Sequence, residues 1–310
     1  MLKVADIHFL QNDQIDKQQW DKCINTSLHG LIYARSFYLD NICPGWKALT
    51  GDNYGWVLSI TNRTKFGISY LYQPPFTQQS GVFAKPGVVV PYKEILQWLQ
   101  QHYKFWEINW NYATDTNFIT SPVNITPATN FVLNLSAGYD RIAVNYHKDL
   151  IKNLNRSKRF QLKYRPTNDY NKGIELFKKH YANRVSHVKE DDYKKFSNIC
   201  SYSLNNQMFI GREVFSDKNE FLAMALILND GKRLYNLMNI TTEAGRQAEA
   251  NHFLLDAILR EFAGNELLFD FEGSDLPGVK AFYKNFGAIN QPYYMLTYNN
   301  LPALVKLFKK

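Results

Sequence analysis

The segment from Gly245 to Ala288 constrains the fold more than any other part of the chain. Apolar side chains recur in it at the spacing of one helix face, at Ala250, Phe253, Leu254, Ala257, Ile258 and Phe262. Gly264 and Asn265 follow and are typical of a helix end. The apolar run 267–271 is too short for a helix and predicts a largely buried strand. A helix and a strand joined by a tight link indicate an α/β unit.

The length of 310 residues indicates two domains, because a single hydrophobic core stops growing near this size. The polar, proline-containing segment 111–130 suits a linker or an irregular crossing segment between them. We therefore predict domains at 1–136 and 137–310.

An internal echo supports a duplication. A helix predicted at 91–103 precedes a strand at 105–110, and this order repeats at 248–262 and 266–271. In the second half the pattern also predicts a helix over 140–155. Antiparallel strands are predicted at 221–228 and 234–240, joined by the hairpin turn Asn229–Lys232.

Basic residues are unevenly distributed in a chain whose formal charge is +8. Seven of them gather in the segment Lys148–Arg165, namely Lys148, Lys152, Arg156, Lys158, Arg159, Lys163 and Arg165. Such a cluster is typical of a solvated helix face, and it also suits a phosphate or nucleic-acid contact. Both interpretations stay open.

Cysteine and histidine spacing exclude the common metal sites. The three cysteines, Cys23, Cys43 and Cys200, form no CxxC pair, and the seven histidines show no HExxH motif. No apolar run approaches the length of a membrane span, and the first residues lack the order of a secretory signal. We expect a reduced cytoplasmic protein with no metal and no membrane span.

The order of elements then becomes specific. Strands lead into a small-residue turn, GRQAEAN at 245–251, and a helix, a strand and a second helix bearing AFYKNFGA at 281–288 follow. This order resembles the GNAT acyltransferase superfamily, in its doubled branch that includes the Fem peptidyltransferases. The resemblance implies an α/β (α+β) fold of two GNAT-like domains, with mixed, mostly antiparallel sheets flanked by helices. The domains would face each other across a cleft, with a degenerate N-terminal domain on the substrate side and the acyl-donor site in the second domain.

The same resemblance implies a donor site at the turn. In GNAT enzymes, backbone amides of this turn and of the following helix hold the pyrophosphate of acyl-CoA, where small residues and the helix N-terminus favour an anion. Here Gly245 stands where Arg or Gln is expected, and Arg246 is one place late; an ordinary glycine-containing turn is the alternative. The expected ligand is acetyl-CoA or another acyl-CoA, and the implied cofactor-binding residues are Gly245, Arg246, Ala248, Ala250, Asn251 and, through backbone N–H groups for the oxyanion, Met238, Asn239 and Ile240.

Tyr283 is the implied general acid. GNAT enzymes place a tyrosine here that protonates the departing CoA thiolate, and a phenol of pKa about 10 is a competent donor to a thiolate of pKa about 8.5. Fem peptidyltransferases have Phe-Lys at this place, so Phe282-Tyr283 favours a thioester over aminoacyl-tRNA. The alternative is that Tyr283 is an amphipathic core residue.

Two carboxylates and two N-terminal residues complete the candidates. Asp270 and Glu272 share one face at the end of a strand and suit proton acceptance from an attacking amine; structural roles remain the alternative. Tyr33 and Arg35 suit contact with an anionic or peptide-like substrate, or a surface turn that leads into a helix.

Together these features predict an N-acyltransferase that moves an acyl group from an acyl-CoA-like thioester to an amine of a small-molecule or peptide-like acceptor. One alternative is a Fem-like aminoacyl-tRNA-dependent transferase, with tRNA held by Lys148–Arg165. A second alternative is a catalytically silent binding module with the same fold.

Overall fold

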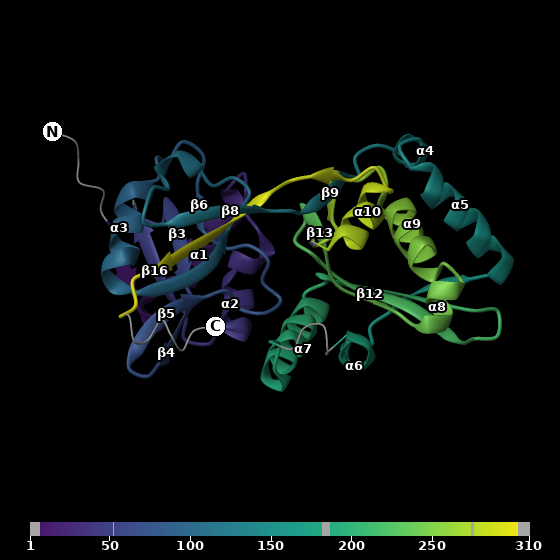
Figure 1. Ribbon diagram of the computed structural model, residues 1–310, viewed down its shortest axis with the longest axis horizontal. Helices are drawn as coiled ribbons and strands as arrows, with labels where there is room; N and C mark the ends of the chain where they lie inside the picture. Colours follow the sequence, from purple (N-terminus) through teal and green to yellow (C-terminus); the bar gives the residue numbers. More distant parts are fainter. Residues whose placement is uncertain (1–6, 52, 182–186, 274–275, 303–310) are drawn as a thin grey trace. The chain divides into compact units, whose positions relative to one another are not determined.

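The computed structural model describes residues 7–51, 53–181, 187–273 and 276–302, and the chain divides into two compact units (Figure 1). Unit 1 comprises Met1–Ala128 and Pro292–Lys310, and unit 2 comprises Thr129–Gln291. Each unit is built from mixed, mostly antiparallel sheets flanked by helices, which is the predicted fold class.

Unit 1 contains two sheets. One has the order β1-β2-β3-β6 and the other β4-β5-β7-β16-β8. The strands of the first sheet are β1 (His8–Leu10), β2 (Lys47–Gly51), β3 (Trp56–Ile60) and β6 (Val82–Ala84). Those of the second are β4 (Asn62–Lys65), β5 (Ile68–Tyr72), β7 (Phe105–Trp110), β8 (Asn124–Ala128) and β16 (Tyr293–Asn299). The helices are α1 (Lys17–Thr26), α2 (Ser36–Ile42) and α3 (Tyr92–His102), and α1 begins after Asp16, whose carboxylate accepts from two backbone amides.

The C-terminal strand explains why the units differ from the predicted domains. β16 pairs antiparallel with β7 and with β8, so the last described residues complete the sheet of unit 1. β8 lies inside the segment 111–130, which the sequence indicated as a linker. Polar residues can form such a strand because every β8 residue is exposed or half-buried. The boundary between the units falls at Ala128 and Thr129 rather than at residue 136.

Unit 2 contains one sheet of order β10-β11-β12-β13-β14-β9-β15. Its strands are β9 (Phe131–Asn134), β10 (Lys163–Thr167), β11 (Phe209–Phe215), β12 (Phe221–Asn229), β13 (Arg233–Thr241), β14 (Leu268–Asp270) and β15 (Ile289–Asn290). Its helices are α4 (Tyr139–Ala143), α5 (Lys148–Ser157), α6 (Tyr170–Tyr181), α7 (Glu190–Asn205), α8 (Glu243–Gln247), α9 (Ala250–Phe262) and α10 (Pro277–Lys284). The predicted hairpin turn between β12 and β13 is confirmed, with Gly231 at a φ of 89°.

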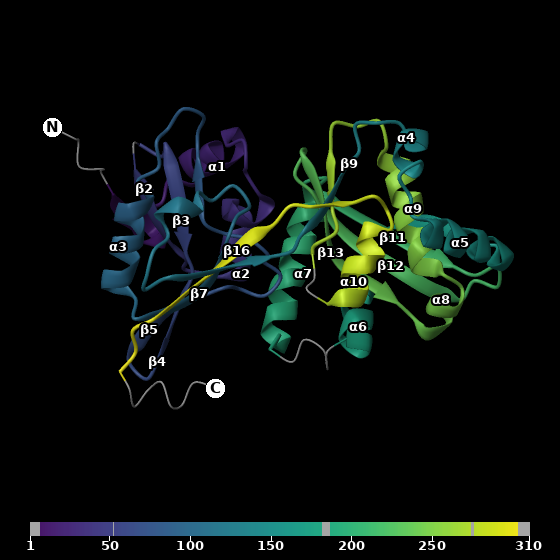
Figure 2. The ribbon, with the colours of Figure 1, turned by 45° about the horizontal axis from the view of Figure 1, so that its top comes forward.

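The two faces of the unit 2 sheet have different partners. Ala223 and Ala225 of β12 belong to the core cluster formed with α9. The intervening residues of β12, such as Met224, point to the other face of the sheet and pack against α6. The approach is close, since a Cβ on Gly173 of α6 would lie 2.8 Å from the Met224 sulfur. Figure 2 shows α9 and α10, and Phe282 and Tyr283 of α10 pack into the same cluster as α9.

The helix predicted over 140–155 is interrupted. It forms as α4 and α5, because the His147 amide donates to the Asn285 carbonyl at 2.8 Å and the His147 ring accepts the Asp149 amide as the N-cap of α5. Periodicity alone does not reveal this break, since the apolar stripe continues across it.

The predicted duplication is visible in the topology. β13 pairs parallel with β14 across α9, and β5 pairs parallel with β7 across α3. The other pairings between named strands are antiparallel. Within the described residues, each unit therefore has a βαβ crossover between its parallel strands. In the part of the chain that is described, no helix is long and apolar enough to cross a membrane.

Candidate active site

The centre of unit 2 has an opening between two parallel strands. β13 and β14 pair only from Arg233–Leu268 to Tyr235–Asp270, after which β14 ends and β13 continues to Thr241. The edge of β13 from Asn236 to Thr241 therefore has no β14 residue beside it. In open α/β sheets, ligands bind beyond the carboxyl ends of the strands, and this is such a place.

A β-bulge shapes β13 at this point. The pairing with β12 shifts between Leu226 and Leu228, so that Ile227 lies opposite both Asn236 and Leu237. Before the bulge, Leu234 points to the sheet face that packs against α9, where it belongs to the core cluster. Asn236 is two residues further along the strand and therefore points to the same face. Beyond it Asn239 pairs with Ala225, whose side chain is on the α9 side as well. The bulge thus brings both asparagines to one face.

These asparagines and Asn251, in the first turn of α9, contain buried amide atoms. Nδ2 and Oδ1 of Asn236, Nδ2 of Asn239 and Oδ1 of Asn251 have no hydrogen-bond partner among the described residues. Buried polar atoms are nearly always paired, and each unpaired one costs about 1–3 kcal/mol. Two of these amides lie along the β13 edge that β14 leaves free, and unpaired amides of this kind are typical of a site that binds a polar ligand.

The backbone of β13 offers one amide to this opening. The Thr242 amide donates to Leu222 of β12, whereas the Thr241 amide donates away from β12, to the Tyr181 hydroxyl at 3.3 Å. Because amides alternate along an antiparallel ladder, Met238 and Ile240 direct theirs to β12 and Asn239 directs its own toward the β14 side. Of the three expected oxyanion donors, Asn239 has the suitable orientation.

The segment GRQAEAN spans the end of the short helix α8 and the start of α9, and its glycine has a packing role. A Cβ on Gly245 would lie 2.2 Å from the Leu222 carbonyl oxygen, so the residue allows α8 to approach β12. The Gly245 amide donates to the Thr242 hydroxyl at 3.0 Å, and the Arg246 and Ala248 amides donate within the turn. The Arg246 guanidinium donates to the Thr241 carbonyl at 3.1 Å.

A carboxylate occupies the start of α9. Glu249, in the left-handed region at a φ of 57°, precedes Ala250, and its side chain pairs with Arg156 at 2.9 Å and with His252 at 3.0 Å. Burial lowers the pKa of His252 below its usual value, and Glu249 opposes this shift. A carboxylate is stabilised by the helix dipole here, and Arg156 compensates much of the repulsion it would exert on a further anion. Ala250 and Asn251, expected to bind pyrophosphate, lie beside this charge.

Tyr283 lies on α10 beside the end of β14. Its ring is 4.9 Å from that of Phe271, and its side chain is partly buried against the core of unit 2. Burial, and then the charges of Glu272 and Asp270, raise its pKa above the ordinary tyrosine value, so the phenol is protonated throughout the physiological range. Both the general-acid role and the core role agree with this placement.

Asp270 is fully buried and every contact of its carboxylate is internal. Arg233 Nη1 donates to Oδ2 at 2.7 Å, Asn130 Nδ2 donates to the same oxygen at 3.1 Å, and the Glu272 amide donates to Oδ1 at 2.9 Å. Arg233 also donates to Gln291 at 3.0 Å. These bonds join β13, β14 and Asn130, the residue that precedes β9, which favours the structural alternative for Asp270.

Glu272 is the carboxylate nearer to solvent. It is partly buried, has a φ of 56°, and follows the strand end at which Tyr283 lies. Its charge acts on the Tyr283 phenol, which places the two groups in the same neighbourhood. Glu272 therefore suits contact with an incoming amine better than Asp270 does.

The two expected substrate residues lie in unit 1. Tyr33 is in the 3-10 helix η2 (Ile32–Ala34), is 1% exposed, and makes an edge contact with Tyr38 at 5.5 Å between ring centroids. Arg35 is half-buried and caps α2. Tyr33 is a core side chain, and Arg35 is the member of the pair with exposed surface.

No group of three or more metal-ligating side chains is present within the described ranges. Sequence reasoning missed Asn236, Glu249 and Arg233. The signal for Asn236 was two asparagines, NLMN, inside an otherwise apolar strand, a position where polar residues are costly unless paired.

Comparisons with known proteins identify the fold. No protein-family model matches the chain, and no curated protein matches it. Among solved structures it is similar to FemX, with a TM-score of 0.65 and 13% identity over 98% of this chain and 100% of that chain. It is also similar to L-PGS from Bacillus licheniformis, with a TM-score of 0.55 and 11% identity over 94% of this chain and 95% of that chain. A tandem GNAT protein from the clavulanic acid biosynthesis pathway has a TM-score of 0.53 and 11% identity over 96% of this chain and 100% of that chain.

The chain therefore has the doubled GNAT fold that these proteins share. The predicted resemblance to the doubled GNAT branch with its Fem-like members is confirmed at the level of the fold.

Proposed function

We propose that the protein transfers an acyl group from an activated ester or thioester to an amine, at the opening between β13 and β14. The observation that supports this most is the set of unpaired buried amide atoms of Asn236, Asn239 and Asn251. Amide groups donate to and accept from the amide and carbonyl groups of an acyl donor, and the Asn239 backbone amide suits the oxyanion.

The chemistry needs few groups. The amine nitrogen attacks the acyl carbonyl carbon, and the bond from that carbon to sulfur or oxygen then breaks. Tyr283 gives its proton to the leaving group, and the amine loses a proton to Glu272, directly or through water. Tyr283 holds its proton at neutral pH, and its raised pKa makes it a weaker acid than a free phenol. Proximity supplies much of the remaining rate.

Glu249 bears on the choice of donor. Its carboxylate lies at the start of α9, where an acyl-CoA of GNAT type would place its pyrophosphate, and because Arg156 pairs with it, its repulsion of that pyrophosphate is weak. A thioester held through its pantetheine amides, or an aminoacyl ester, avoids this repulsion. The second candidate is a Fem-like aminoacyl-tRNA donor, which the resemblance to that branch implies.

Binding measurements separate the donors. S-acetylpantetheine contains the thioester and amides of acetyl-CoA without its diphosphate. We expect it to raise the melting temperature as much as acetyl-CoA does, since ligand at one hundred times its Kd adds about 2.7 kcal/mol. Charged tRNA, tested in parallel, should bind with a steep salt dependence if it is the donor. Absence of binding by all three donors contradicts the proposal and favours a silent binding module.

Two variants test the site itself. Asn239→Ala should weaken donor binding about fivefold to tenfold through loss of one hydrogen bond, whereas Asn168→Ala, at an exposed position, is the matched control. Tyr283→Phe should lower kcat with KM nearly unchanged, measured by release of the free thiol or tRNA with a panel of amines. If Tyr283→Phe and Glu272→Gln both retain full turnover, the assigned roles are wrong.

A further inference from the structure

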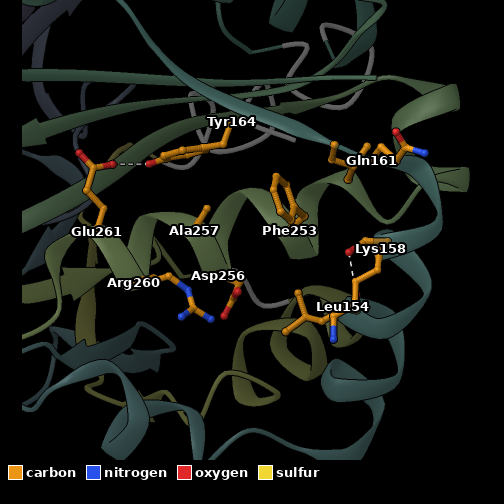
Figure 3. A pocket seen from close by; sticks show the side chains of 11 residues that line it. Leu154, Lys158, Gln161, Tyr164, Phe253, Asp256, Ala257, Arg260 and Glu261 are labelled. Carbon is orange, nitrogen blue, oxygen red and sulfur yellow. Dashed lines mark hydrogen bonds between the residues drawn. The ribbon is translucent and has the colours of Figure 1, made fainter. Parts of the chain in front are cut away.

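Unit 2 contains a cavity of about 600 Å³ that is separate from the β13–β14 opening. It lies between α5, the start of β10 and the outer stripe of α9, and none of its lining residues belongs to the candidate active site (Figure 3). The volume is within the range of about 300–1,000 Å³ that small-molecule sites occupy.

The cavity exists because α9 has a small residue in this stripe. Phe253 and Ala257 lie one helical turn apart on the same side of α9, and the small Ala257 side chain leaves space beside the Phe253 ring (Figure 3). Leu154 of α5 and the Tyr164 ring complete the apolar walls. The body of a ligand in this cavity would therefore contact mainly carbon atoms.

The charged groups of the lining are unequally neutralised. Glu261 is paired with Arg212 and accepts the Tyr164 hydroxyl, while Asp256 accepts the Tyr139 hydroxyl at 2.6 Å. Glu261 thus has a cationic partner, whereas Asp256 is held by neutral hydroxyl groups and keeps its negative charge.

The two cations of the lining differ in this respect. Lys158 Nζ contacts the neutral Asn155 amide oxygen at 2.9 Å, and Arg260 lies 3.6 Å over the Tyr139 ring. Neither has a carboxylate at ion-pair distance among the described residues. Among the described residues, the lining charges without an ion-pair partner are two positive ones, on Lys158 and Arg260, and one negative one, on Asp256, so the balance is positive.

We propose that this cavity binds an amphipathic anion, with its apolar body beside Ala257 and Phe253 and its carboxylate or phosphate head at Lys158. In this proposal one residue of the basic segment Lys148–Arg165 binds the anionic head of the ligand. Arg156 and Arg165 are occupied by Glu249 and Glu213, whereas Lys158 lies on the cavity lining. An anion with an apolar body matches both the charge and the wall chemistry.

Calorimetric titration of the full chain with simple amphiphiles below their micelle concentrations tests this. We expect decanoate, decyl phosphate or both to bind at one site, and their relative affinities distinguish a carboxylate from a phosphate head. Decyltrimethylammonium should bind at least about tenfold more weakly, because its head is repelled by Lys158. Inorganic phosphate alone should not bind measurably, since it makes no use of the apolar walls.

Variants locate the binding. Ala257→Phe fills the cavity with a ring and should abolish binding of both anions, while Ala257→Ser, of nearly the same size, should retain it. Lys158→Gln should weaken the anions about tenfold, and Lys152→Gln, which removes the same charge outside the lining on α5, should leave their affinity unchanged.

Three results overturn the proposal: equal affinity for the anionic and cationic amphiphiles, unchanged binding in Ala257→Phe, or equal effects of Lys158→Gln and Lys152→Gln. If Ala257→Phe fails to fold, the two exposed lysine variants still decide the outcome. None of these readouts depends on acyl transfer, so the cavity is tested independently of the proposed reaction.

Discussion

Asp270→Asn should destabilise unit 2 strongly. The Asp270 carboxylate accepts Arg233 at 2.7 Å, and the two side chains are 1% and 5% exposed. Substitution by an isosteric amide removes the negative charge that faces Arg233 Nη1 in this buried place, although the bond from Arg233 to Gln291 is retained. The negative charge of Asp270 is therefore removed at a buried position, where water cannot solvate the remaining charge of Arg233.

The magnitude follows from this burial. Removal of one partner of a buried ion pair costs about 3–5 kcal/mol, most of it the cost of the charge that is left behind. For a unit of this size the change corresponds to a fall in melting temperature of roughly 6–20 °C. An exposed pair behaves differently: Asp191 pairs with Lys195 one helical turn away, at 73% side-chain exposure, and Asp191→Asn should cost about 0.3–0.5 kcal/mol.

Urea denaturation followed by far-ultraviolet circular dichroism measures both variants under the same conditions. The double variant Arg233→Met/Asp270→Leu supplies the third measurement, because apolar residues of similar volume often replace a buried ion pair with little loss. The double variant should be less destabilised than the sum of the two single changes.

A cost below about 1 kcal/mol for Asp270→Asn would refute this reasoning. So would strict additivity of the two single changes, because the pair would then not act as a unit. Activity adds a separate result. Well below its melting temperature the variant should retain turnover, since the carboxylate serves the fold; complete loss of activity in a folded variant would instead support proton acceptance by Asp270.

Three further outcomes follow from the same unit. Burial raises the pKa of Tyr283, so the folded state holds the phenol proton more tightly than the unfolded state does. The resulting stability is present below about pH 10 and is lost as the pH rises through the folded pKa. Tyr283→Phe should therefore reduce the fall in melting temperature at alkaline pH. Burial lowers the pKa of His252 from 6.5, so the unfolded state binds more protons than the folded state in mild acid. The free energy of unfolding therefore falls as the pH falls below about 6.5. His252→Gln should make the melting temperature depend less on pH in this range. Gly245→Ala places a Cβ 2.2 Å from the Leu222 carbonyl oxygen and should cost about 1–3 kcal/mol in urea denaturation, whereas Gly278→Ala, with no atom within 4 Å, should be neutral.

Local patterns predicted the centre of unit 2 correctly. The periodicity that predicted α9, the short apolar run of β14 and the turn residues of the β12–β13 hairpin all act within a few residues. The duplication could be predicted for the same reason, because each βαβ crossover repeats one local pattern.

Long-range pairing was beyond such patterns. β16 joins unit 1 because it pairs with Phe105–Trp110 and Asn124–Ala128. The residues 293–299 alone do not determine these partners. The interruption between α4 and α5 depends in the same way on a bond from His147 to a carbonyl in α10's C-terminal turn, contributed by Asn285. Tertiary hydrogen bonds decide both features.

The asparagine site shows why the candidate site was harder to predict than the fold. Asn236 and Asn239 are three residues apart, and in a regular strand this odd separation places them on opposite faces. A reader of the sequence would therefore assign at most one of them to the α9 side. The bulge opposite Ile227 adds one residue to β13, so side chains after the bulge point to the opposite face from the one that regular alternation would give them. Both amides therefore lie on the same face. The bulge depends on the register with β12, and a ligand-binding face of this kind becomes visible only when that register is known.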